Sequence, residues 1–82
     1  MNQIRADQDL WATSLMPEGI LDKWLKPDGA YVEAGEAVAA LRIEGALHEL
    51  MSPADGWLTV DRKANSVIEP GAVLGHIGRD RA

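Results

Sequence analysis

The residues that could support catalysis or metal binding are few and scattered. His48 and His76 are the two histidines, and they lie far apart in the sequence, whereas a protein metal site needs three or four ligands. Glu44 and Glu49 are expected to flank a hairpin, but no nucleophile or base pairs with them. The chain contains no cysteine, which excludes disulfides, thiolate catalysis and cysteine-based metal sites. We therefore predict no catalytic residue and no metal ligand, and we expect that the chain is not an enzyme.

Serines, glycines and tryptophans leave that prediction unchanged. None of the serines lies in the G-x-S-x-G setting of a hydrolase nucleophile; they are Ser14, Ser52 and Ser66. The glycines fall at turns rather than in a phosphate-binding loop, so nucleotide binding is not indicated. The chain has no phenylalanine, and we expect Trp11, Trp24 and Trp57 to fill the core or a sheet surface. Exposure of Trp24 and Trp57 on one face would instead mark a binding surface.

Length and charge limit the class of protein. Eighty-two residues are enough for one domain, and eight Lys and Arg against thirteen Asp and Glu give a net charge of −5. This charge repels phosphate backbones and anionic membranes and favours basic partners. No apolar run approaches the roughly 20 residues that span a bilayer, and residues 1–9 lack the apolar segment of a signal peptide. Together with the absence of cysteine, these features predict a cytoplasmic protein that binds neither nucleic acid nor membranes.

An internal repeat organises the chain. Residues 18–43 and 55–80 align as two copies, in each of which four residues recur at three-residue spacing. These residues are Val32, Gly35, Val38 and Leu41 in the first copy, and Ile68, Gly71, Leu74 and Ile77 in the second. The same spacing and the alanine-rich residues 33–50 also suit a helix. However, Pro70 would cost about 3 kcal/mol inside the equivalent helix of the second copy, so the repeat predicts short strands on either side of a glycine turn.

Short apolar runs between turn signals predict the remaining strands. The runs are 10–15, 20–25, 38–43, 47–51, 57–60 and 73–77. Many short strands at regular spacing are typical of a sandwich or a flattened barrel. We predict an all-β domain over residues 9–79 in which each repeat supplies one sheet and the two sheets pack face to face. Residues 1–8 and 80–82 are expected to be flexible ends.

The ordered set of these residues resembles the lipoyl and biotinyl carrier domains over about residues 10–78. The resemblance rests on Met16-Pro17-Glu18-Gly19-Ile20, Lys23-Trp24-Leu25, Gly29, Val32, Gly35-Glu36, Val38, Ala46, Glu49, Ser52-Pro53, Asp55-Gly56, Ile68, Gly71, Leu74 and Ile77. It implies a barrel-sandwich hybrid, in which a pseudo-two-fold axis relates two four-stranded antiparallel sheets. In such domains an exposed hairpin presents one lysine, whose amine forms an amide with lipoate or biotin.

The resemblance places Gly45 at the position of that lysine, without a gap on either side. Glu44 and Ala46 match the family's acid before the lysine and the alanine after it, whereas Ile43 replaces a small polar residue. Arg42 replaces an acid near the site that the modifying ligase reads. The hairpin of residues 42–46 is thus interpreted as a vestigial attachment site, and neither lipoate nor biotin is expected. The lysines at positions 23, 26 and 63 align with ordinary surface positions.

The resemblance implies three hypotheses for function. The first is a protein-interaction or scaffold module that docks to an acyltransferase, dehydrogenase or carboxylase subunit without carrying a cofactor. The second is a cofactor carrier of a 2-oxo acid dehydrogenase or carboxylase complex. The third is a relative of the hybrid domains in membrane-fusion subunits, which are usually flanked by helical hairpins and an export signal; neither feature is expected in this chain. Fold alone does not decide among these functions.

Overall fold

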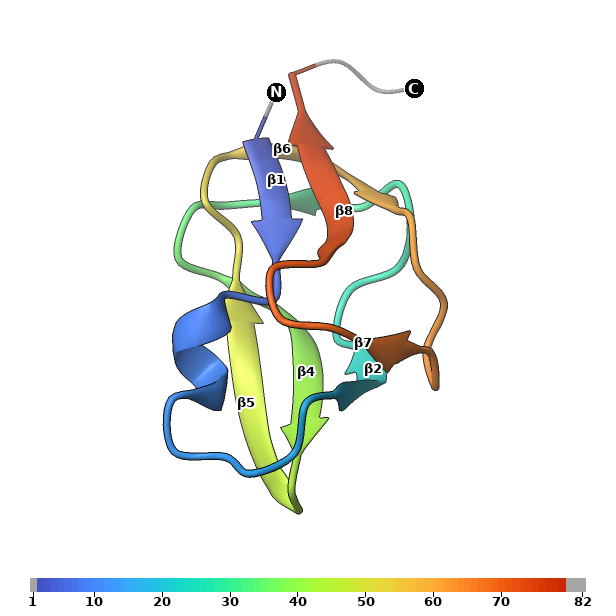
Figure 1. The fold of residues 1–82 in the computed structure, drawn as a ribbon. Helices are drawn as coiled ribbons and strands as arrows, with labels where there is room; N and C mark the ends of the chain where they lie inside the picture. Colours follow the sequence, from blue (N-terminus) through green and yellow to red (C-terminus); the bar gives the residue numbers. More distant parts are fainter. Residues whose placement is uncertain (1, 80–82) are drawn as a thin grey trace.

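Eight β-strands form two antiparallel sheets in the computed structural model, which describes residues 2–79 (Figure 1). The strand orders are β1-β8-β6-β3 and β5-β4-β2-β7. The elements are β1 (Asn2–Arg5), a short 3₁₀ helix η1 (Gln8–Trp11), β2 (Gly19–Trp24), β3 (Tyr31–Val32), β4 (Ala37–Ile43), β5 (Ala46–Met51), β6 (Gly56–Val60), β7 (Val67–Ile68) and β8 (Val73–Gly78). No α-helix occurs within residues 2–79. The predicted all-β class with two four-stranded sheets is confirmed.

Aliphatic side chains from both sheets make up the core. The largest fully buried ones are Ile4, Leu21, Leu41, Leu58, Ile68, Leu74, Val32 and Val38. They include five of the six aliphatic residues that define the repeat, and full burial of each side chain contributes about 1.5–3 kcal/mol. The alanine-rich residues 33–50 form β4 and β5 rather than a helix, as the second copy of the repeat predicted.

The turns that join the short strands to the long ones match in the two halves. Gly35 and Gly71 have φ of 85° and 87°, a left-handed conformation that glycine adopts without steric cost. The N–H of Gly35 donates to the carbonyl of Ser52 at 2.9 Å, and that of Gly71 donates to the carbonyl of Ala6 at 2.7 Å. The glycine turns predicted at these two positions are therefore present, with equivalent hydrogen bonds.

The repeat is also visible in the strand register, but the assignment of one sheet to each half is wrong. The short strands are exchanged: β3 joins the sheet of β6 and β8, and β7 joins the sheet of β2 and β4. In one sheet Gly19 pairs with Ile68 and Ile20 with Val67. At the equivalent positions of the other sheet, Gly56 pairs with Val32 and Trp57 with Tyr31. The exchange occurs because residues 25–30 and 61–66 carry the chain from one sheet to the other. A sequence repeat shows which strands are equivalent, but it does not show which strands pair with each other.

Residues 2–8 contain β1 and the start of η1, whereas residues 1–8 were expected to be a flexible end; residue 1 lies outside the described residues. Residues 2–5 form β1, which pairs with β8 along the edge of its sheet. Ile4 and Ala6 are buried, and burial of this apolar surface offsets the entropy lost on ordering the strand. The strand register makes β1 the counterpart of β5. Asn2 of β1 pairs with Ile77, and His48 of β5 pairs with Leu41, which is the residue equivalent to Ile77 in the repeat. The expectation of a flexible end at 80–82 lies outside the described residues.

The run at residues 10–15 does not form the expected strand. The carboxylate of Asp7 accepts a hydrogen bond at 2.9 Å from the backbone N–H of Asp9, which caps η1. The helix directs Trp11 into the core, and Leu10 packs against the core. Residues 12–18 then continue without regular structure to β2. The cap at Asp7 therefore favours a short 3₁₀ helix here, whereas the apolar run alone had predicted a strand.

Candidate functional site

The tip of the β4–β5 hairpin is a two-residue turn. Ile43 pairs with Ala46, and the turn residues between them, Glu44 and Gly45, have φ of 51° and 85°. Two successive positive φ values are typical of the type I′ turn, which matches the twist of the flanking strands. Nothing lies within 4 Å of a Cβ placed on Gly45. The structure thus places Gly45 at an open tip, at the opposite end of the molecule from the start of β1 and the end of β8 (Figure 1).

The side chain of Glu44 connects the tip to the segment before β2. Its Oε1 accepts a hydrogen bond from the backbone N–H of Leu15 at 3.3 Å. Beneath the hairpin, Trp11 and Ile43 lie against Gly19, since a Cβ there would meet their atoms at 3.3 and 3.0 Å. The hairpin is therefore supported from the core side by η1 and the start of β2.

Arg42 belongs to a row of side chains that crosses the outer face of its sheet. Val67 pairs with Ile20, Ile20 with Arg42, and Arg42 with Leu47, and all four side chains are exposed. The guanidinium of Arg42 lies 3.4 Å from a carboxylate oxygen of Asp22. Arg42 is thus part of a mainly apolar row of side chains, and the carboxylate of Asp22 compensates its charge.

Exposed aliphatic side chains are concentrated around this end of the molecule. Their exposed fractions are 94% for Leu15, 51% for Met16, 44% for Ile20, 54% for Leu47 and 54% for Val67. Met16, Ile20 and Val67 line a shallow pocket of about 260 Å³ that also reaches Gly45. A grouping of exposed aliphatic residues is a mark of an interaction site, whereas single exposed residues are ordinary. Sequence analysis missed this grouping because its members come from four separate segments.

Residues considered for catalysis are not brought together. His48 lies on β5 and His76 on β8, in different sheets. His76 contacts the carboxylate of Asp61 at 3.0 Å, and no group of three or more His, Asp or Glu side chains suited to a metal ion occurs within residues 2–79. The hydroxyls of Ser14, Ser52 and Ser66 donate to the backbone carbonyls of residues 16, 54 and 63 at 3.4, 2.6 and 2.6 Å.

The three tryptophans pack within the fold. Trp11 is buried, and Trp24 packs against the core while its Nε1 donates to the carbonyl of Arg62 at 2.8 Å. Trp57 meets Tyr31 edge to face, with a centroid distance of 5.1 Å. Trp24 and Trp57 belong to different sheets, so they do not form one exposed face.

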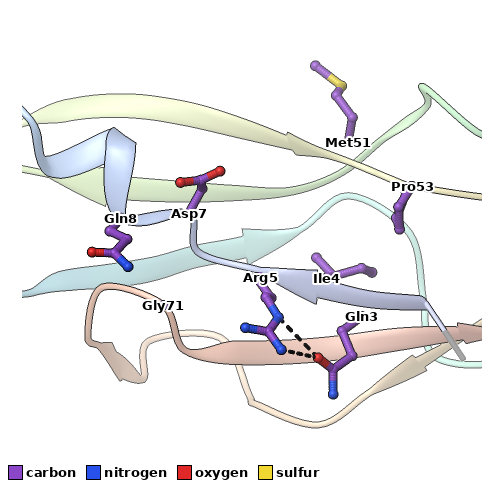
Figure 2. A pocket seen from close by; sticks show the side chains of 8 residues that line it. All are labelled: Gln3, Ile4, Arg5, Asp7, Gln8, Met51, Pro53 and Gly71. Atoms are coloured by element: carbon purple, nitrogen blue, oxygen red, sulfur yellow. Dashed lines mark hydrogen bonds between the residues drawn. The ribbon is translucent and has the colours of Figure 1, made fainter.

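A second pocket, of about 400 Å³, lies between β1 and the end of β5. Figure 2 shows that Gln3 and Arg5 lie on one side of β1 and Ile4 on the other. The guanidinium of Arg5 donates to Oε1 of Gln3 at 3.0 and 2.6 Å. Because Arg5 and Gln3 bond to each other, and the polar side chains of the pocket do not converge on a common point, this pocket lacks the arrangement of a chemical site.

The hairpin tip does not fit a covalently attached carrier group. Such a group needs a primary amine on a long stem, and residue 45 has no side chain. Lys23 lies on β2 and Lys63 between β6 and β7, and the ammonium of Lys26 lies 2.6 Å from the carboxylate of Glu36. None of the three lysines therefore lies at the tip.

Comparisons with known proteins leave the family open. Neither a scan against models of known protein families nor a search of curated proteins returns a match for this chain. Within residues 2–79, none of the helical structure is long and apolar enough to cross a membrane. Assignment to a family therefore depends on the symmetry of the two sheets and on the geometry of the hairpin.

Proposed function

We propose that this chain is a non-enzymatic protein-interaction module related to the lipoyl and biotinyl carrier domains, and that it carries no covalent cofactor. The observation that carries the proposal is Gly45, which occupies an open two-residue turn beside a cluster of exposed aliphatic side chains. A carrier domain presents a lysine at such a tip. In this chain the tip has lost the amine, and its surroundings are those of a docking surface.

The arrangement of the strands supports the relationship. The register of β4 with β5 repeats in β8 with β1, and the short strands β3 and β7 are exchanged between the sheets in equivalent ways. This is the pseudo-two-fold arrangement expected of a barrel-sandwich hybrid. The β4–β5 hairpin projects away from both ends of the described chain (Figure 1). This position suits its presentation to a partner.

Protein is the class of partner that fits this surface best. The net charge of −5 disfavours nucleic acid and anionic membranes. Exposed aliphatic side chains on a rigid sheet can bury apolar area in a complex, which is the main source of stability in many interfaces. By the resemblance, the partner is an acyltransferase, dehydrogenase or carboxylase subunit. The absence of cysteine suits a reducing compartment, and we place the protein in the cytoplasm.

Site-specific cross-linking tests this function in the cells that express the protein. A photoreactive residue at position 49, on the outer face of β5, is expected to capture a discrete partner. The matched control is the same photoreactive residue at position 3, because Gln3 on β1 is the register counterpart of Glu49. Capture at position 49 and not at position 3 supports docking at the hairpin end. Equal capture at both positions, or capture at neither, contradicts it.

A further inference from the structure

The pocket beside the hairpin tip has the size and lining to receive one aliphatic side chain. Its walls include Met16, Ile20 and Val67, and Gly45, which also lines it, has no side chain to obstruct it. Its volume of about 260 Å³ lies below the roughly 300–1,000 Å³ typical of sites for whole small molecules. The pocket therefore suits an anchoring side chain better than a cofactor.

The charged groups at the pocket favour a cation next to that anchor. Glu18 and Glu44 both line the pocket and are exposed. Arg42 also lines it, but its guanidinium lies 3.4 Å from the carboxylate of Asp22, so its charge is compensated within the chain. The two glutamates and the net charge of −5 together make the local potential negative.

This charge also selects among the possible occupants. A second copy of the chain carries the same charge of −5 and the same acidic rim, so pairing the two pockets would bring like charges together, which costs affinity. An acidic peptide is disfavoured for the same reason. A segment with lysine or arginine beside an aliphatic residue gains both apolar burial and electrostatic attraction.

We infer that the pocket binds a peptide segment of a partner protein in which one aliphatic side chain is flanked by lysine or arginine. This inference rests on the proposed interaction function and names the chemistry of the partner. The aliphatic side chain enters between Met16, Ile20 and Val67, and the basic residues lie over Glu18 and Glu44.

Fluorescence polarisation with three labelled peptides tests the inference. The basic probe is Gly-Lys-Arg-Ala-Leu-Ala-Lys-Arg-Gly, the neutral probe has serine at the four basic positions, and the acidic probe has glutamate there. The basic probe is expected to bind at least tenfold more tightly than the other two. Its affinity should fall several-fold as salt rises from about 50 to about 300 mM, because salt screens exposed charges. Equal affinities for the three probes would overturn the inference.

Variants then locate the binding to this pocket. Val67→Lys is expected to weaken the basic probe at least tenfold, because it removes an apolar wall and adds a repelling charge. Tyr31→Lys is the matched control, since Tyr31 holds the equivalent place on β3 and has the same exposed fraction of 54%; it should change the affinity less than twofold. Glu18→Gln with Glu44→Gln should weaken the basic probe and leave the neutral probe unchanged. Equal losses in the Val67 and Tyr31 variants would contradict the inference.

The outcomes separate this inference from the function on which it rests. Capture of a partner at position 49, combined with failure of the basic probe to bind, leaves the interaction function standing and refutes a basic, aliphatic segment as its ligand. Binding of the basic probe that Val67→Lys abolishes supports the partner chemistry by a measurement independent of cellular capture.

Discussion

The hairpin end of the molecule and the opposite end share a backbone scheme and differ in their side chains. Leu41 pairs with His48 at the first end, as Ile77 pairs with Asn2 at the second. The outer cross-strand rows are different: the first is Val67, Ile20, Arg42 and Leu47, and the second is Tyr31, Trp57 and Gly78. At the second end Tyr31 and Trp57 pack edge to face, whereas at the hairpin end the exposed side chains of the row are aliphatic apart from Arg42. The scaffold is therefore symmetric, and the row of exposed aliphatic side chains at the hairpin end is the reason why we propose docking there.

The largest expected effect comes from replacing a residue in one half with the residue that stands at the equivalent position in the other half. Gly75 is the register counterpart of Ala39, but a Cβ on Gly75 would lie 2.5 Å from the carbonyl oxygen of Thr59 and 3.1 Å from Trp24. Gly75→Ala is expected to lower the free energy of unfolding by about 3 kcal/mol, measured by urea denaturation, because the backbone clash has no rotamer that relieves it. Ala39→Gly, the reverse exchange, should cost only about 1 kcal/mol. Equal losses would show that the two positions are not differently packed.

Replacing tryptophans compares the packing at Trp11, beneath the hairpin, with that at Trp24, at the end of β2. Trp24→Phe removes a 2.8 Å hydrogen bond to the carbonyl of Arg62 and a contact with Gly75, and it should cost about 1–2 kcal/mol. The buried Nε1 of Trp11 has no hydrogen-bond partner among the described residues. Trp11→Phe removes that unsatisfied donor, which offsets part of the lost packing, so its cost should be smaller. Thermal denaturation of both variants checks this order, and a larger loss for Trp11→Phe would contradict it.

The turn at the tip should give a smaller effect. Gly45→Ala places a side chain at φ 85° in open space, so the cost is conformational and amounts to about 1 kcal/mol. Gly45→Asn should recover part of this loss, since asparagine tolerates the left-handed conformation. Urea denaturation of the two variants measures the difference. A cost above about 3 kcal/mol would mean that the tip is packed and not free to face a partner.

The smallest expected effect depends on pH. The hydrogen bond from Lys26, followed by that from the backbone N–H of Glu33, lowers the pKa of Glu36 below its ordinary value. A carboxyl whose pKa is lower in the folded state adds stability above its unfolded pKa of about 4.3, and this stability is lost as pH falls through the folded pKa. Lys26→Met should therefore lower the melting temperature slightly at pH 7, and the difference from wild type should shrink as the pH falls below the unfolded pKa of Glu36.

The matched control for this pair is in the other half. Lys63 aligns with Lys26, but the residue equivalent to Glu36 is Ala72. The equivalence follows from the backbone: the N–H of Ser52 donates to the carbonyl of Glu36, and the N–H of Ala6 donates to the carbonyl of Ala72. Lys63→Met should therefore show no such dependence on pH. A matching loss in the Lys63 variant would mean that general charge balance, rather than the pair, causes the effect.

The sequence predicted the core and the tip because both depend on local or periodic signals. Val32 and Ile68 are buried as the repeat required, and Glu44 with Gly45 form the turn that their types favour. The strand exchange could not be predicted, since a repeat carries no information about partners. Strand β1 was missed because only Ile4 among its four residues is apolar. The cluster of exposed aliphatic side chains was missed because Met16, Ile20 and Val67 meet only in the folded chain.

Mass spectrometry of intact protein shows whether this chain carries a lipoyl or biotinyl group and whether residue 45 is the attachment position. Wild type and the double variant Gly45→Lys with Arg42→Glu are each expressed together with lipoate ligase and biotin ligase. We predict that wild type remains unmodified, and that the folded double variant gains the mass of one lipoyl or biotinyl group. A modified wild type would show that the chain is a carrier after all. An unmodified double variant that retains the wild-type circular dichroism spectrum would show that residue 45 is not the position of the lost lysine.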